Sequence, residues 1–331
     1  MELKAKANLK AFYSRSEETA STFASECKNL GFEGFDIYSD ETSQPGRHLD
    51  DLLKREDIKA VIVLLPIPIQ PDMIRRCFAA GKHVLSEKPI AKDVHTGRIL
   101  LEDYKKKYAD QNLVFNVAEQ FRFMESAELA RKWLVDEKAV GKLMQVHVRI
   151  WRNIKPGGKY YETAWRKTPE YQGGFILDGG VHHIALARYV CGQEIVETRG
   201  YARQIAEHMP PLDTVNASIL LTDGATGTIS MSFSSTKHAT DYSFVGTQGT
   251  LSMTGNPSET KLTLEDASGK VAKTETVKNH SVQREIEAFV QAVQVGSGNA
   301  GSRIGPEEAL NDLAVIESLC SGGGKVSLTQ I

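Results

Sequence analysis

Short apolar runs alternate with amphipathic stretches of helical length over residues 8–117. Four apolar runs predict strands, namely Leu9–Tyr13, Ala60–Leu65, His83–Ser86 and Leu113–Val117. Three amphipathic stretches predict helices, namely Ser16–Leu30 with Ser16 as its N-cap, Pro71–Ala80 and Val94–Tyr108. Because Ala60–Leu65 is apolar throughout, it predicts a strand that is buried on both faces. Strands and helices in this order are typical of a doubly wound α/β domain with a parallel sheet.

The pattern changes after about residue 120. One helix is predicted at Ser126–Glu137, and two more near the end of the chain, Val282–Val293 and Pro306–Leu319. Between them, alternation with a period of two predicts mostly antiparallel strands, such as Leu143–Trp151, Val215–Thr222 and Thr226–Ser234. We therefore expect two domains, an α/β domain over 1–120 and an α+β domain with flanking helices over 121–331.

Composition and charge restrict the class of protein. The chain has 331 residues, of which 40 are Lys or Arg and 42 are Asp or Glu, giving a formal charge of −2 without any long block of like charges. Nucleic acid and membrane surfaces are therefore not expected partners. The four cysteines form no Cys-x-x-Cys pair, and no metal site is predicted. The longest apolar run, Ala60–Ile69, is too short to span a bilayer, so we expect a cytoplasmic protein.

A first candidate for chemistry is the segment Gly81–Pro89, where a buried strand ends in Glu87-Lys88-Pro89. Ligands of open α/β sheets bind beyond the carboxyl ends of the strands, so Lys88 lies where a substrate would be met. A cis bond before Pro89 would fix the direction of the Lys88 side chain. The alternative is a solvated Glu-Lys pair at a strand end.

A second candidate is the segment Gly173–His183, which contains Asp178 and His182. Residues four apart share a helix face, and a carboxylate beside an imidazole orients the ring and raises its basicity, so the two residues form a plausible proton-transfer pair. The alternative is that Asp178 caps a helix and His182 is a core histidine. His183 points to another face, and we interpret it as structural.

These segments, in this order and at this spacing, resemble the glucose-fructose oxidoreductase and inositol dehydrogenase (Gfo/Idh/MocA) family. The resemblance covers essentially the whole chain, through Asp57–Pro66, Ala79–Ile90, Trp165-Arg166, Asp178-x-Gly180-x-His182 and Val245–Leu251. It implies a two-domain NAD(P)-dependent oxidoreductase that acts on small sugars, polyols and related alcohols or carbonyls. In that family Lys88 would lie near the nicotinamide and the reacting oxygen, His182 would be the general acid/base, and Asp178 would hold substrate hydroxyls or the imidazole.

The resemblance also implies residues that bind ligands. Those expected at the cofactor are Ser14, Arg15, Leu65, Pro66, Glu87, Lys88, Glu119 and Gln120. Those expected at the substrate are Arg122, Tyr161, Trp165, Arg166, Asp178 and His182. Serine and arginine after the second family strand suit a 2′-phosphate, so NADP is favoured over NAD, although Arg15 as a solvated residue is an alternative. For Trp165, a core position is equally compatible with the sequence.

The chain departs from the family pattern in three places. No strand with a Gly-x-Gly-x-x-Gly turn precedes Leu9, and Met1–Asn8 resembles the end of the first family helix, so an incomplete Rossmann-type sheet with an exposed edge is expected. Gln70 takes the place of a family histidine in the segment that begins at Leu65. Ala185 stands where an acidic residue often follows the histidine.

Two functions from different classes follow. The first is an NADP(H)-dependent oxidoreductase that acts on a small sugar-like, polyol or secondary-metabolite substrate. The second is a catalytically silent member of the same fold that serves as a binding or regulatory protein. Lys88, Asp178 and His182 together favour the enzyme. The open face of the antiparallel sheet also suggests a homo-oligomer.

Overall fold

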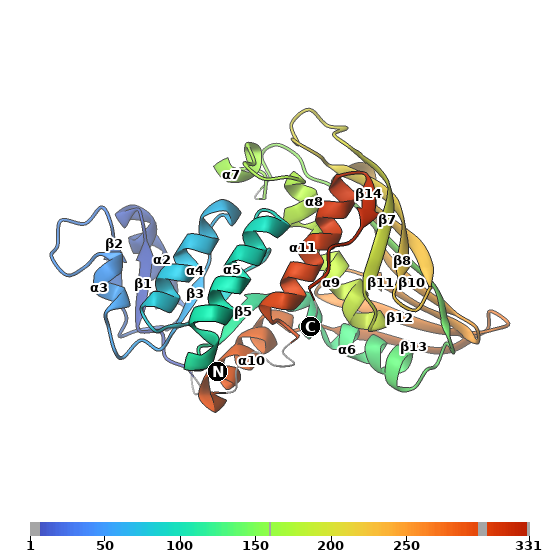
Figure 1. Ribbon diagram of the computed structural model, residues 1–331, viewed down its shortest axis with the longest axis horizontal. Coiled ribbons are helices and arrows are strands. Elements are labelled where there is room, and N and C mark those ends of the chain that lie inside the picture. The colour runs from blue at the N-terminus through green and yellow to red at the C-terminus, as the bar shows by residue number, and fades with distance from the viewer. Residues whose placement is uncertain (1–6, 159, 297–302, 330–331) are drawn as a thin grey trace.

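The structure is a computed structural model that describes residues 7–158, 160–296 and 303–329. The parallel strands of the first part lie at one end of the molecule and a large sheet lies at the other (Figure 1). The expectation for Met1–Asn8 falls largely on residues 1–6, which lie outside the described residues. Among the described helices, none combines the length and the apolar character needed to cross a bilayer.

The first part contains the expected alternation of strands and helices. Its strands are β1 (Ala11–Ser14), β2 (Asp36–Ser39), β3 (Ala60–Val63), β4 (His83–Glu87) and β5 (Phe115–Ala118). Its α-helices are α2 (Glu17–Asn29), α3 (Leu49–Leu53), α4 (Gln70–Ala79) and α5 (Val94–Lys107). The Ser16 hydroxyl caps α2 by accepting from the amide of Thr19, as the sequence predicted. β2 and α3 were not predicted, because the short segments that form them carry little periodicity.

The parallel strands of the first part form two sheets. β1 pairs with β2, whereas β3, β4 and β5 form a separate sheet in that order. In the described part of the chain, no strand bridges β1 and β3. Ile62 on β3 and Leu64 just beyond it are 46% and 62% exposed, which is high for apolar residues of a parallel sheet. The sheet is thus of incomplete Rossmann type, as expected.

The second part is built on a nine-stranded sheet in the order β13-β12-β11-β10-β6-β9-β8-β7-β14, antiparallel except for the β6–β9 pair. The strands are β6 (Leu143–Asn153), β7 (Ile195–Arg203), β8 (Thr214–Leu221), β9 (Thr226–Ser232), β10 (Ser234–Gly246), β11 (Gly249–Gly255), β12 (Glu259–Asp266), β13 (Val271–Lys278) and β14 (Gly323–Lys325). Alternate residues of β8 and β9 are buried, so one face of the sheet packs on helices and the other is open.

The helices of the second part connect this sheet to the first part. They are α6 (Glu125–Arg131), which continues as a π-helix over Lys132–Asp136, α7 (Ala164–Lys167), α8 (Gly174–Asp178), α9 (Gly180–Cys191), α10 (Ser281–Val295) and α11 (Pro306–Cys320). A 3₁₀ turn, η3 (Gln120–Phe123), joins β5 to α6. α11 lies between α5 and the large sheet (Figure 1).

α10 packs on the parallel sheet of the first part. Its Phe289 is 2% exposed and belongs to a cluster with Leu85 of β4, Val114 just before β5 and Ala118 of β5. The sequence predicted this helix but not its place, since nothing local relates it to strands almost two hundred residues earlier. The domain boundary near residue 120 therefore remains a prediction. By sequence α10 belongs to the second part, but it packs on the sheet of the first part.

Candidate active site

Lys88 and Asp178 meet where the carboxyl end of β4 approaches α8. The Lys88 ammonium donates to Asp178 Oδ1 at 2.8 Å and also to the Asp178 backbone carbonyl. Both side chains are largely buried, with exposed fractions of 13% and 10%. The Lys88-Pro89 bond is cis. Lys88 is therefore not the solvated residue of the alternative interpretation, because it is fixed against a residue ninety positions later.

Arg166 holds the other oxygen of the same carboxylate. Its Nε donates to Asp178 Oδ2 at 2.7 Å, and its guanidinium lies 4.0 Å from the centre of the Trp165 ring. Burial by itself raises the pKa of Asp178, but the charges of Lys88 and Arg166 outweigh it and lower that pKa to about 2. Asp178 is therefore a carboxylate shared between two cations.

The expected pair of Asp178 and His182 does not form. α8 ends at Asp178, Gly179 interrupts the helical run, and α9 begins at Gly180, so the two residues lie on different helices. The Asp178 carboxylate turns to Lys88 and Arg166 instead, because both offer a full positive charge. Nor does Asp178 cap a helix at its N-terminus.

His182 pairs with Glu119. Its Nδ1 lies 2.7 Å from Glu119 Oε1, and Glu119, directly after β5, is 2% exposed. Burial alone raises the pKa of Glu119, yet the charges of His182, Arg122 and Lys88 lower it below its usual value. Because an ionised carboxylate has no proton, Nδ1 of the neutral imidazole is the donor, and Nε2 is left as the acceptor. His182 thus has the tautomer that a general base requires at Nε2.

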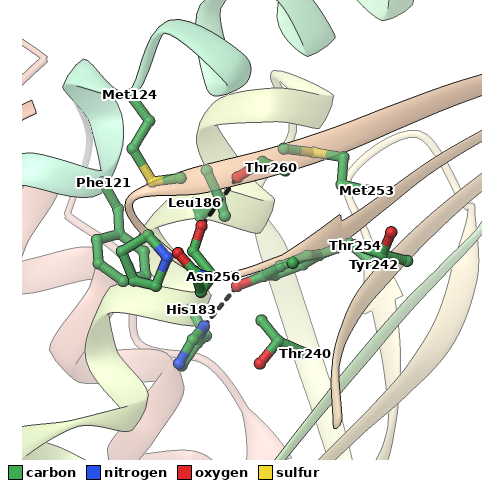
Figure 2. A pocket seen from close by; sticks show the side chains of 12 residues that line it. Phe121, Met124, His183, Leu186, Thr240, Tyr242, Met253, Thr254, Asn256 and Thr260 are labelled. Carbon is green, nitrogen blue, oxygen red and sulfur yellow. Dashed lines mark hydrogen bonds between the residues drawn. The ribbon is translucent and has the colours of Figure 1, made fainter. Parts of the chain in front are cut away.

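Phe121 fixes the plane of the His182 ring. The two rings stack with centroids 4.6 Å apart, and the Phe121 amide donates to Glu119 Oε1 at 3.2 Å. On its other side, Phe121 meets the edge of His183 and lines a small apolar cavity (Figure 2). His183 is bonded through Nδ1 to the Tyr242 hydroxyl, and burial lowers the pKa of His183 well below its usual value. This histidine is a buried neutral group of the cavity wall.

The glycines before Asp178 permit a close approach to another loop. Gly173 and Gly174 have φ values of +79° and +47°. A Cβ on Gly174 would lie 2.6 Å from the Pro210 carbonyl oxygen. Larger residues at this position would move α8 and with it Asp178.

The residues expected at the cofactor lie at the carboxyl ends of four strands, in two sheets. Glu87 ends β4 and Lys88 follows it, Glu119 and Gln120 follow β5, and Leu65 and Pro66 follow β3. Ser14 and Arg15 lie at the end of β1, in the separate two-stranded sheet. Arg15 is exposed, and its guanidinium forms no ion pair with the described residues.

Arg122 is not available to a ligand in this structure. Its side chain is 2% exposed and donates to Asp312 at 2.9 Å, to Glu308 and to the Arg303 carbonyl. Arg188 shares the same two acids. The expectation of a substrate contact is corrected here, since Arg122 connects η3 to α11.

Tyr161 and Trp165 lie on the loop that carries Arg166. Tyr161 meets the edge of the His208 ring, with centroids 5.5 Å apart, and Lys167 lies 5.5 Å from the Tyr161 centroid. Trp165 is half-buried and packs near Tyr171. Both aromatic residues thus lie in the same loop region as Arg166, and Trp165 contacts its guanidinium.

Sequence reasoning missed Glu285 of α10. This glutamate is 4% exposed, and its Oε1 has no hydrogen-bond partner among the described groups. The signal was available, because Glu285 precedes the buried Phe289 by one helical turn and so occupies a position where an apolar residue is expected.

Comparisons with known proteins match both parts of the fold. Residues 1–110 match the profile described as "Oxidoreductase family, NAD-binding Rossmann fold", and residues 129–252 match that of the GFO/IDH/MocA C-terminal domain. Dehydrogenase FPY6 of Fusarium mangiferae is 38% identical over 328 residues, which cover 96% of this chain and 91% of the relative.

Two similar solved structures hold different cofactors. KijD10, a 3-ketoreductase from Actinomadura kijaniata in complex with NADP and TDP-benzene, has a TM-score of 0.74 and 22% identity, covering 95% of this chain and 89% of its own. Levoglucosan dehydrogenase in complex with NADH has a TM-score of 0.77 and 18% identity, covering 97% and 91%. At these identities the two structures show a shared fold.

Proposed function

Since this chain belongs to the Gfo/Idh/MocA oxidoreductase family, we propose that it is an NADP(H)-dependent enzyme that interconverts a carbonyl and an alcohol on a small sugar-like or polyol substrate. The observation that carries the proposal is the joint placement of Lys88 and His182. One side chain is fixed by Asp178 and the other by Glu119, at neighbouring strand ends. A silent binding protein has no chemical need for both arrangements.

The residues at these strand ends fit a dinucleotide. The side-chain amide of Gln70 is 1% exposed and has no partner for either polar atom among the described groups, and Glu119 Oε2 is likewise unpartnered. Such groups are suited to contact a polar ligand. Leu65, Pro66, Glu87 and Gln120 would line the nicotinamide side, and Ser14 with Arg15 would hold the 2′-phosphate. A bound nicotinamide dinucleotide supplies the hydride chemistry of the reaction.

The side chains of this chain supply the proton and the charge. The Lys88 ammonium stabilises negative charge that develops on the substrate oxygen, since Asp178 positions it there. His182 Nε2 takes or gives the proton of that oxygen, while Glu119 holds Nδ1–H and stabilises the imidazolium. Arg166, Tyr161 and Trp165 are the proposed substrate contacts, because they surround Asp178 on the loop side.

Cofactor choice is tested by titrating NADPH and NADH into the protein while nicotinamide fluorescence is followed. We expect NADPH to bind at least about tenfold more tightly, and Arg15→Ala to weaken NADPH by about tenfold or more without changing NADH. Arg47→Ala is the matched control, because Arg47 is already paired with Asp36. Equal affinities, or no effect of Arg15→Ala on NADPH, would contradict the NADP assignment.

The reaction is tested with a panel of aldoses, ketoses, keto sugars and nucleotide sugars in the presence of NADPH. Lys88→Met and His182→Gln should each lower kcat by about 10²–10⁴, with NADPH affinity changed only a few-fold. His147→Gln, on the open face of β6, controls for the loss of a histidine. Wild-type turnover in Lys88→Met would refute the assigned role.

A second copy of the chain is the proposed occupant of the open sheet face. Leu220 and Trp151 lie there, on the side of β8 and β6 opposite to the buried residues. Light scattering coupled to size-exclusion chromatography should give a mass of at least twice 36.5 kDa. A monomer at all concentrations would contradict this expectation.

A further inference from the structure

Glu285 of α10 is a buried acid close to the proposed proton-transfer pair. It interacts with the backbone amide of Glu119, the residue that holds His182. The strongest charges that act on Glu285 are those of two other acids, Glu119 and Glu87. Three carboxyl groups thus gather at the carboxyl ends of β4 and β5, although only Glu119 accepts a hydrogen bond from His182.

The position of Glu285 is fixed from both sides along α10. The preceding residue, Arg284, donates to the Phe123 carbonyl at 2.7 Å and binds both oxygens of Glu128. One turn later, Phe289 is buried against the parallel sheet. Because α10 is anchored at both points, Glu285 cannot turn to solvent without breaking these contacts.

The basic groups on α10 and on the elements packed against it are already engaged, in most cases with acids. His83 of β4 is the exception, because its Nδ1 accepts from the Val114 amide and burial lowers its pKa, so it offers no charge to Glu285. Arg284 and Arg303 bind Glu128, His280 binds Glu125, Arg122 binds Glu308 and Asp312, Lys88 binds Asp178, and His182 binds Glu119. A buried carboxylate without a cation is strongly disfavoured. Glu285 therefore keeps its proton at neutral pH, in accord with a pKa that burial, Glu119 and Glu87 raise to about 9.

We infer that Glu285 is a positioning residue that acts as a neutral acid behind Glu119, so that Glu119 remains the single anion beside His182. The inference rests on the proposed function of His182. A neutral Glu285 contacts the Glu119 backbone and adds no second negative charge next to the Glu119 carboxylate. If Glu285 were ionised, two buried anions would lie side by side, and His182 would respond to the negative charge of both rather than to Glu119 alone.

The test is an NMR titration of the histidine Cε1–H signals in the free protein from pH 5 to 10, with His182→Gln to assign the His182 signal. In the wild type, the His182 signal should show a second step near pH 9, when Glu285 ionises. Glu285→Gln should abolish this step and keep the Nδ1–H tautomer. Glu287→Gln, two residues along the same helix, should retain the step and serves as the matched control.

Infrared spectroscopy gives an independent readout at pH 7. The wild type and Glu287→Gln should show the carbonyl band of a protonated carboxylic acid, and Glu285→Gln should lack it. The absence of both the second step and the band in the wild type would overturn the inference, even if Glu285→Gln does not fold. Since neither measurement uses cofactor or turnover, failure of the proposed function would be seen separately, as loss of NADPH binding or of reduction.

Discussion

Replacing Glu285 by glutamine removes an ionisable group from a buried position and keeps its shape. The pKa of Glu285 is raised from 4.5 to about 9, mainly by burial. Between these two pH values, the native protein therefore keeps a proton on Glu285 that the unfolded chain has released. The contribution of this group to stability is fully present below about pH 4.5. It is lost progressively as the pH rises towards 9.

The size of the effect follows from proton linkage. With one more proton bound in the native state, the free energy of unfolding falls by about 1.4 kcal/mol per pH unit. Between pH 4.5 and pH 7 the loss amounts to about 3 kcal/mol. Glutamine does not titrate, so its amide adds only a constant cost, of about 1–3 kcal/mol if its donors stay unpaired. The difference in stability between Glu285→Gln and the wild type should therefore shift in favour of the variant by about 1.4 kcal/mol per pH unit.

Urea unfolding, followed by tryptophan fluorescence at pH 5.5, 6.5, 7.5 and 8.5, measures this slope directly. Glu287→Gln is the control, because Glu287 is half-exposed on the same helix and no comparable slope is expected. If the stabilities of Glu285→Gln and the wild type stay parallel across this range, Glu285 is ionised or hydrated in the native state. The reasoning from its burial would then be refuted.

Three further substitutions test other parts of the structure. Asp178→Asn should lower the free energy of unfolding by about 2 kcal/mol at pH 7, since the pKa of this carboxyl is lowered from 3.8 to about 2, and the deficit in urea unfolding should shrink below pH 4. Asp312→Ala leaves two buried arginines short of an acid and should cost about 3–5 kcal/mol, seen as a lower Tm, whereas an unchanged Tm would contradict its place in the network. Gly174→Ala should cost about 1–3 kcal/mol because its Cβ meets the Pro210 carbonyl, and a wild-type urea midpoint would show that the turn can yield.

The sequence was a good guide wherever a signal is local. The Ser16 cap, the strand that ends at Lys88 and the amphipathic helices follow from periodicity and capping, and the structure has them within a few residues. The strands from Ser234 to Lys278 were predicted only in part, because polar residues fill their exposed positions and β13 is exposed almost throughout, which leaves few apolar positions to mark each strand. Periodicity also does not show that β1 and β3 belong to different sheets, since sheet pairing is a long-range property.

The candidate site illustrates the same limit. Lys88, Asp178 and His182 were found from motifs, but their partners were not, because each partner comes from a distant element. The four-residue spacing suggested a bond between Asp178 and His182, and a single interruption at Gly179 was enough to separate them. Electrostatic pairing in a buried site is decided by which full charges lie in reach, and helix spacing alone does not give that information.

The charges of the site are balanced in a way that suits the proposed reaction. Lys88 and Arg166 are cations paired with the Asp178 carboxylate, Glu119 is the anion paired with His182, and Glu285 is neutral. When His182 takes a proton, the new positive charge lies against Glu119, and the anion on that side is not diluted by a second carboxylate. An ionised Glu285 would add a second negative charge behind the imidazole. Because negative charge raises the proton affinity of an imidazole, His182 would then hold its proton too tightly to return it.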